Sequence, residues 1–123
     1  MSKGTIIVDF DGVIHRYSRG WADGTIYDAP IPRCAQTLQK FMDDGYDIVV
    51  FSTRTDDRVI GGIPQKGQYE EIVAYLKKYG IPFTRVHRGE GKPLGVLYID
   101  DNAMRFEGNW EDAYIEATRI LEG

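Results

Sequence analysis

Two aspartates stand one residue apart, directly after an apolar run that is typical of a buried strand. The run covers residues 5–8, and the segment Asp9-Phe10-Asp11-Gly12-Val13 follows it. Because strand side chains alternate between faces, both carboxylates are expected to start on the same side of the sheet. Charged residues at the end of a short apolar strand contribute little to packing. They are well placed to bind a ligand, since ligands of open α/β sheets bind outside the carboxyl ends of the strands.

Polar residues also follow two other predicted strands. Ser52-Thr53-Arg54 comes after the apolar run at 47–51, and Asp100-Asp101 comes after the run at 96–99. In a right-handed parallel α/β sheet these carboxyl ends lie side by side. We therefore expect these residues to meet the first pair of aspartates at one edge of the sheet.

Carboxylates gathered this closely repel one another unless a cation binds between them. Mg²⁺ prefers carboxylate and carbonyl oxygens and also binds substrate phosphate. One carboxylate can then act as nucleophile through an aspartyl-phosphate, and a second one two residues away can act as general acid and base. Lys92, in the loop before the fourth strand, would have to reach across to offset charge on the phosphoryl oxygens. The residues thus predict Mg²⁺-dependent phosphoryl transfer.

Strand and helix patterns alternate along the chain, which predicts a mainly parallel α/β sheet built from βαβ units. Strands are expected at residues 5–10, 47–51, 83–87 and 96–99, and helices at 32–44, 68–79 and from 110 onward. Asn109 is expected to cap the last helix, with Asp112 three residues further on. Residues 55–66 and 89–93 are interpreted as loops. The aromatic residues on the helix stripes, Tyr69, Tyr79, Trp110 and Tyr114, are expected in the core.

A flap is expected between the first strand and the first helix, at about residues 13–30. This segment has no helical period and contains Gly20, Trp21, Gly24 and Tyr27. A small β-hairpin lying over the strand end is one form that it could take. Trp21 and Tyr27 either pin the flap to the body or stack on a base or sugar of the substrate.

Length and composition favour a single domain spanning residues 1–123. A chain of 123 residues with 42% hydrophobic residues can bury a core, and its single cysteine excludes an internal disulfide. No run is apolar enough for a membrane span or a signal peptide, so a soluble cytoplasmic protein without a membrane partner is expected. The net charge of −4 argues against a surface for long nucleic acid, but not against a substrate with one phosphate end.

Four motifs in order resemble the haloacid dehalogenase superfamily of phosphohydrolases, over nearly the whole chain. They are Asp9-x-Asp11-Gly-Val, the strand 48–51 ending in Ser52, Lys92-Pro93, and Ile99-Asp100-Asp101. The pairing of Ser52 with Arg54 and the ending at 98–101 are similar to the smallest members, including polynucleotide-end phosphatase domains. The resemblance implies a Rossmann-like, three-layer α/β/α sandwich with a mainly parallel sheet.

The resemblance also implies a Mg²⁺ site. Asp9 would be the nucleophile and a metal ligand, and Asp11 would be the general acid and base while its backbone carbonyl binds the metal. Asp100 would bind Mg²⁺ directly or through water, and Asp101 would support the same shell. Asp101 can alternatively serve as a helix cap or a structural carboxylate.

Further roles follow from the same resemblance. Ser52 would hydrogen-bond the phosphoryl group, and Lys92 would neutralise charge and orient Asp9. Ser52 can also be a plain turn residue, and Lys92 a surface lysine. The candidates for substrate binding are Gly12, His15, Thr53 and Arg54. From its position beside Ser52, Arg54 is expected at the mouth of the site, where it could bind a second phosphate or a substrate backbone. From its position after the first strand, His15 either touches the leaving group or packs the flap.

One departure from the family concerns the cap domain that members acting on small substrates usually carry. Residues 12–51 leave room only for the flap and one helix, and residues 53–91 only for one helix and one short strand. Without a cap, the flap, a large substrate or a neighbouring copy must exclude water, which makes a homodimer plausible. The expected partner is a phosphorylated small molecule, nucleotide or nucleic-acid end.

The leading interpretation is a Mg²⁺-dependent phosphomonoester hydrolase. A narrower alternative is a phosphatase specific for nucleotides or phosphorylated nucleic-acid ends, and an alternative of another class is a catalytically silent phosphate- and metal-binding domain. A response-regulator receiver fits less well, because its phosphorylated Asp ends a central strand where this chain has Ser52.

Overall fold

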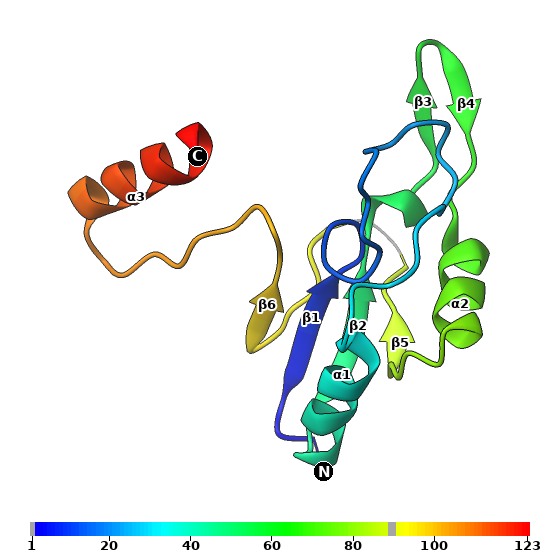
Figure 1. Cartoon of the computed structure of the whole chain (residues 1–123), viewed down its shortest axis with the longest axis horizontal. Coiled ribbons are helices and arrows are strands. Elements are labelled where there is room, and N and C mark those ends of the chain that lie inside the picture. The colour runs from blue at the N-terminus through cyan, green and yellow to red at the C-terminus, as the bar shows by residue number, and fades with distance from the viewer. Residues whose placement is uncertain (1, 89–90) are drawn as a thin grey trace.

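A four-stranded parallel sheet forms the centre of the molecule, which we describe from a computed structural model covering residues 2–88 and 91–123 (Figure 1). The strands are β1 (Thr5–Asp9), β2 (Asp47–Phe51), β5 (Arg85–Val86) and β6 (Leu97–Ile99). Their order in the sheet is β5-β2-β1-β6, and all three pairings are parallel. The prediction of an α/β chain with a mainly parallel sheet is therefore confirmed.

The register of the sheet brings three strand ends together. Asp9 at the end of β1 lies opposite Phe51 at the end of β2, and Val8 lies opposite Ile99 at the end of β6. The residues that follow β2 and β6 consequently leave the sheet beside the end of β1. Parallel pairing is what makes this possible, because it places every carboxyl end at the same edge.

Two helices cover one face of the sheet. They are α1 (Cys34–Asp43) and α2 (Tyr69–Lys78), and both contribute to the same core as alternate residues of β1 and β2. The buried members of this core are Ile6, Val8, Phe10, Ile14, Leu38, Ile48, Val50, Ile72, Tyr75, Leu76, Ile81 and Val86. Burying each large aliphatic side chain contributes about 1.5–3 kcal/mol, so this face holds the body together.

On the opposite face of the sheet, the segment before β6 packs against β1. Ile7 and Val49 point to this side and are buried. A Cβ built on Gly95 would lie 2.6 Å from Cγ1 of Ile7, so the backbone of the segment before β6 rests directly on β1. Close approach of this kind requires a glycine.

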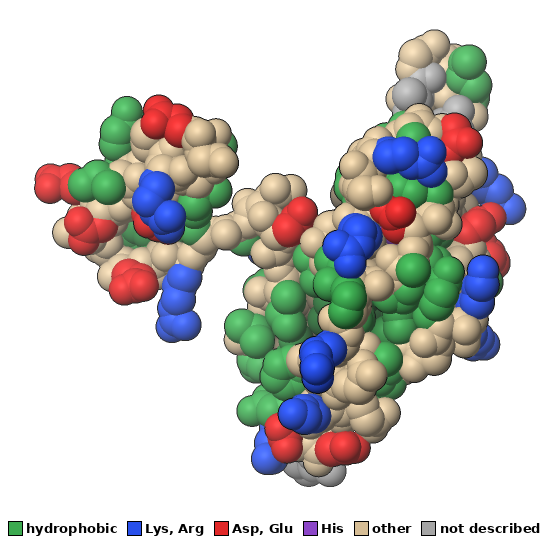
Figure 2. Space-filling model, in the orientation of Figure 1, with side chains coloured by type: hydrophobic (Ala, Val, Ile, Leu, Met, Phe, Trp, Pro, Cys, Tyr) green, Lys and Arg blue, Asp and Glu red, His purple; other side chains and the backbone are tan. Residues whose placement is uncertain are grey.

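The last helix, α3 (Trp110–Glu122), lies away from the sheet (Figures 1 and 2). Its start is confirmed: the side chain of Asn109 accepts a hydrogen bond of 3.0 Å from the backbone N–H of Asp112. The prediction that Trp110 and Tyr114 are core residues is wrong, since 79% and 74% of their surface is exposed. Residues 100–109 lead the chain outward without returning it, so α3 supplies no third layer on the sheet. Tyr79, also predicted in the core, is exposed at the end of α2.

The segment predicted as a loop at 55–66 contains regular structure. A 3₁₀ turn, η1 (Thr53–Thr55), leads into an antiparallel hairpin of β3 (Arg58–Ile60) and β4 (Ile63–Gln65). Gly61 and Gly62 form its turn with φ of 58° and 79°, the positive values that tight hairpins need. The prediction of a loop was wrong because strands of three residues are too short to show a period. Of the loop predicted at 89–93, residues 89 and 90 lie outside the described part of the chain.

The flap is irregular, as predicted, but residues 13–30 form turns and isolated bridges instead of the small hairpin considered for it. His15 bridges to Pro30, and the backbone N–H of Ile31 donates to the carbonyl of Ile14, which closes the base of the flap. Within residues 2–88 and 91–123, we find no helix with the length and hydropathy of a membrane span.

Candidate active site

Three carboxylates meet where β1 and β6 end. Asp9 is half-buried at the end of β1, whereas Asp100 and Asp101 are exposed directly after β6. One carboxylate oxygen from each lies within 4.8 Å of the others. The backbone N–H of Asn102 donates a hydrogen bond of 2.7 Å to Asp100, which fixes that side chain at the strand end. The predicted convergence of these three residues is therefore confirmed.

The cluster shifts the protonation of its most buried member. Burial, followed by the nearby charge of Asp100, raises the pKa of Asp9 from its usual 3.8 to about 7, and Asp101 adds to the effect. Both causes disfavour a negative charge on Asp9. A bound cation would remove this penalty, and carboxylate oxygens are the ligands that hard divalent cations prefer. The three residues therefore fit a metal ion.

Gly12 gives Asp101 its place in the cluster. A Cβ built on Gly12 would lie 2.2 Å from Oδ2 of Asp101, closer than atoms can approach. The φ of Gly12 is +82°, a conformation that other residues adopt only with strain. Gly12 thus makes room for a carboxylate, a role that differs from the substrate binding predicted for it.

Asp11 is separate from the cluster because two other side chains hold it. Nε of Arg54 donates to Oδ2 of Asp11 at 2.7 Å, and Nδ1 of His15 lies 2.9 Å from Oδ1. A tight turn brings His15 back to this point, since the carbonyl of Phe10 accepts from the backbone N–H groups of Ile14 and His15. Both oxygens of Asp11 are thereby occupied.

The hydrogen bonds of His15 define which of its nitrogens carries the proton. Its Nε2 accepts a hydrogen bond of 3.1 Å from the backbone N–H of Asp28, so the hydrogen of the neutral ring is on Nδ1 and points to Asp11. The ring is fully buried, and its aromatic neighbours are Phe10, Tyr17, Tyr27 and Tyr75. Of the two predicted roles for His15, the structure favours packing within the flap, joined to contact with Asp11.

Arg54 is buried beneath the flap, with only 2% of its surface exposed. One guanidinium nitrogen donates to the carbonyl of Gly24 and to the side-chain oxygen of Gln68, both at 2.8 Å. The guanidinium also lies over the ring of Trp21, 4.7 Å from its centre. The prediction that Arg54 stands open at the mouth is wrong, because these partners from the flap and α2 enclose it.

Ser52 caps the turn that follows β2. Its Oγ is buried and accepts a hydrogen bond of 3.1 Å from the backbone N–H of Arg54, which starts η1. The hydroxyl keeps its own hydrogen for donation. The register places Ser52 one residue beyond the partner of Asp9, as the sequence predicts. Thr53 is exposed on η1, and its part in substrate binding stays a prediction.

Lys92 lies against an aromatic ring on β6. Its Nζ is 4.1 Å from the centre of the Tyr98 ring, while the Tyr98 hydroxyl donates to the carbonyl of Pro93. Across residues 2–88 and 91–123, no carboxylate forms an ion pair with Lys92. The structure thus does not bring Lys92 to Asp9, and its orienting role stays a prediction.

The flap aromatics hold the flap together, and Trp21 also contacts Arg54 of the body. The Tyr27 hydroxyl donates to the carbonyl of Gly20 and accepts from the backbone N–H of Arg19, both at 2.7 Å. A Cβ on Gly24 would lie 2.8 Å from the Trp21 ring, which therefore packs on the flap backbone. These contacts favour the structural role of both rings over substrate stacking.

Two residues of the site were absent from the sequence-based prediction. Gln68 joins the flap to Arg54 through hydrogen bonds to Arg54 and to the carbonyl of Gly24, and the backbone of Asp28 orients His15. The sequence pattern indicates Gln68 only as the start of a helix. Neither residue belongs to a motif, so no local signal in the sequence identifies them.

No family model, no curated protein and no solved structure matches this chain. The resemblance described above therefore rests on the residues of the four motifs alone.

The raised pKa of Asp9 predicts how the metal-free protein responds to pH. The unfolded chain ionises near 3.8, but the folded chain holds the Asp9 proton up to about 7, so the folded state loses stability as pH rises through that window. The substitution Asp9→Asn removes this penalty. With EDTA present, we expect Asp9→Asn to melt above the wild type by a margin that grows from pH 4.5 to about 7 and then levels off. A margin independent of pH would contradict the burial and repulsion assigned to Asp9.

The place that Gly12 leaves for Asp101 predicts a loss of cation binding in Gly12→Ala. The methyl group must displace the Asp101 carboxylate, and the positive φ adds about 1 kcal/mol of destabilisation or more. Gly20→Ala is the matched control, because Gly20 has φ of +64° and open space around it. We expect millimolar Mg²⁺ to raise the Tm of the wild type and of Gly20→Ala, but much less that of Gly12→Ala. Equal Mg²⁺ shifts in the two variants would show that Asp101 is not needed for binding.

Proposed function

We propose that the protein is a Mg²⁺-dependent phosphomonoester hydrolase and a capless member of the haloacid dehalogenase superfamily. The observation that carries the proposal is the division of the carboxylates into two environments. Among the described residues, no basic side chain forms an ion pair with Asp9, Asp100 or Asp101, which converge, whereas Asp11 is held by Arg54 and His15. One set suits a metal and a nucleophile, and Asp11, two residues from Asp9 and outside the cluster, is the proposed proton donor and acceptor.

The proposed metal ligands are carboxylates of the cluster. Asp9, Asp100 and Asp101 would hold Mg²⁺, and the backbone carbonyl of Asp11 would complete the protein ligands. When bound, Mg²⁺ supplies positive charge that draws a phosphate group to a site otherwise negative. The ion also favours the ionised form of Asp9, which is the form that can act as a nucleophile.

The reaction proceeds in two displacements at phosphorus. In the first, a carboxylate oxygen of Asp9 forms a bond to phosphorus and the bond to the leaving oxygen breaks. The step requires Asp11 in its protonated form, with one oxygen turned from Arg54 or His15 toward the leaving oxygen, to which it gives the proton. In the second, Asp11 takes a proton from a water molecule, whose oxygen attacks phosphorus and breaks the bond to Asp9. Inorganic phosphate leaves, and both aspartates return to their starting state.

The remaining motif residues support the phosphoryl group. The Ser52 hydroxyl, which already accepts from Arg54, can donate its hydrogen to a phosphoryl oxygen. Lys92 would have to leave the ring of Tyr98 to offset charge at Asp9. Both assignments belong to the proposal, as does a cytoplasmic location, which suits a chain with one free cysteine.

The substrate class is a phosphate monoester, and the surroundings of the site leave room for a large one. The flap lies beside the site, and the β3–β4 hairpin projects from the same end of the sheet (Figure 1). Among the described residues no separate cap domain covers the strand ends. A nucleotide or a phosphorylated nucleic-acid end is the narrower form of the proposal.

The proposal predicts phosphate release that requires both Mg²⁺ and Asp9. The assay compares an aryl phosphate, nucleoside monophosphates, sugar phosphates and 3′- or 5′-phosphorylated oligonucleotides, with Mg²⁺ and with EDTA. We expect Asp9→Asn to lower the rate by roughly 10³-fold or more, because it removes the nucleophile. Release that is unchanged in EDTA or in Asp9→Asn would contradict the mechanism, and Mg²⁺ binding without any release would favour a silent binding domain.

The contact between His15 and Asp11 predicts a dependence on the leaving group. An alkyl phosphate needs a proton on its leaving oxygen far more than a nitrophenyl phosphate does, so a poorly oriented Asp11 harms the alkyl substrate more. His15→Leu fills the aromatic pocket but removes the hydrogen bond to Asp11. We expect kcat/KM to fall by about 10–100-fold more for the alkyl than for the aryl substrate, within the range for general acids.

The matched variant for this experiment is His15→Asn, whose amide can donate near the position of Nδ1. We expect it to restore most of the alkyl activity. Equal losses on both substrates in His15→Leu would show that His15 serves the fold alone and does not orient Asp11.

A further inference from the structure

The C-terminal unit, residues 100–123, presents unpartnered apolar surface on both sides of its helix. The exposed apolar residues of this unit are Phe106, Trp110, Tyr114, Ile115, Ile120 and Leu121. A helix with this pattern is stable only when its apolar side packs against another element. In the structure α3 lies clear of the sheet of its own chain (Figures 1 and 2), so that sheet does not cover the apolar side of the helix.

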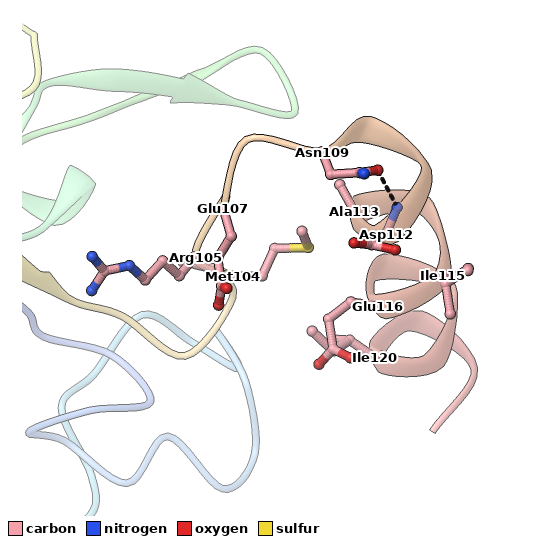
Figure 3. A pocket seen from close by; sticks show the side chains of 10 residues that line it. Met104, Arg105, Glu107, Asn109, Asp112, Ala113, Ile115, Glu116 and Ile120 are labelled. Atoms are coloured by element: carbon pink, nitrogen blue, oxygen red, sulfur yellow. Dashed lines mark hydrogen bonds between the residues drawn. The ribbon is translucent and has the colours of Figure 1, made fainter.

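The C-terminal unit has two hollows that side chains of another element could fill. One, of about 430 Å³, lies between the linker and α3 and is lined by Met104, Phe106, Trp110, Ala113, Tyr114 and Ala117. The other, of about 550 Å³, lies between the same segments and is drawn in Figure 3. There Met104 points toward α3, from which Ile120 and Glu116 point back. Apolar side chains entering the first hollow would complete a core that the unit cannot form alone, whereas the second is also lined by Arg105, Glu107, Asp112 and Glu116 and would form the polar edge of the contact.

Side chains suited to fill the hollows project from the body of the same chain. Leu94, Val96 and Leu97 are 91%, 66% and 45% exposed on and before β6. Hydrophobic side chains also gather on the β6 side of the body in Figure 2. Beside them an apolar groove of about 180 Å³ runs between Ile99 of β6 and Phe41 of α1. Within the described part of the chain, β6 is also an edge strand that pairs only with β1.

The two parts of the chain differ in net charge. Residues 1–99 contain 13 Lys and Arg against 12 Asp and Glu, whereas residues 100–123 contain two against seven. The C-terminal unit is therefore acidic, and the body is close to neutral with a slight positive excess. Such a difference favours contact between the unit and a body over contact between two units.

We propose that two copies of this chain form a dimer by exchanging their C-terminal units. The helix α3 of each copy packs against the β6 side of the other, and Trp110 and Tyr114 meet Leu94 and Leu97 of the partner. A second copy offers this surface without any change in residues 100–109, whereas docking on the chain's own β6 requires the linker to reverse. Reciprocal exchange closes the assembly at two copies and forms the contact twice.

The exchange goes beyond the proposed function, since it depends on the apolar surfaces and on no step of catalysis. It also has a consequence for the site. Asp100 and Asp101 begin the linker that leads to α3. Docking of α3 on a partner would hold the linker at both ends and so restrain the two carboxylates.

The test measures the mass of the full-length protein in solution by size-exclusion chromatography with light scattering. We expect a species of twice 14.0 kDa that dissociates on dilution. Tyr114→Glu alters the helix, and Leu97→Glu alters the receiving surface. Each should weaken dimerisation by roughly 30-fold or more, the effect of losing a central interface residue. Val59→Glu, at an exposed apolar residue on the hairpin, is the control that should stay dimeric.

Mixing the two variants tests the exchange itself. The intact helix of Leu97→Glu can dock on the intact surface of Tyr114→Glu, so one of the two contacts is restored and a heterodimer should appear. Leu94→Glu repeats the receiving-surface test at a residue that is almost fully exposed, in case Leu97→Glu fails to fold. A monomeric wild type at all concentrations, a dimer that persists in both variants, or two monomers that do not associate on mixing would each overturn the proposal.

Discussion

Repulsion among Asp9, Asp100 and Asp101 is the constraint around which the molecule is arranged. The parallel register puts the ends of β1 and β6 side by side, and Gly12 removes the side chain that would keep Asp101 away. The result is a group of carboxylates that raises the pKa of Asp9 to about 7 and costs stability unless a cation is bound. Clustered carboxylates do not stabilise the fold by packing. They form a site that binds a cation, and the bound cation can in turn bind an anionic substrate.

The second aspartate of the pair shows how the fold assigns different chemistry to neighbouring residues. Asp11 is two positions from Asp9, yet Arg54 and His15 satisfy both of its oxygens. Those two side chains are themselves held by Gln68 and by the backbone of the flap at Gly24 and Asp28. The flap therefore acts on the site by fixing Asp11 through His15 and Arg54, and its aromatic residues pack around those two side chains.

The sequence predicts what depends on local pattern and misses what depends on distant packing. The bounds of β2, the Asn109 cap and the meeting of Asp9 with Asp100 and Asp101 follow from period, capping chemistry and parallel topology. The contact of Arg54 with Asp11 joins residues 43 positions apart, and no spacing rule contains it. The stripe of α3 indicates that one face of the helix needs a partner, but not which surface provides it, so Tyr114 was wrongly expected in the core.

Covalent phosphorylation of Asp9 is the central claim, and trapping it is the most direct test. Protein turning over a phosphate monoester with Mg²⁺ is quenched in acid and treated with borohydride, which reduces an aspartyl-phosphate to homoserine. The account predicts homoserine at position 9 by peptide mass spectrometry, absent when EDTA replaces Mg²⁺ and absent in Asp9→Asn. Turnover in which residue 9 remains aspartate, or reduction at another carboxylate, would contradict it.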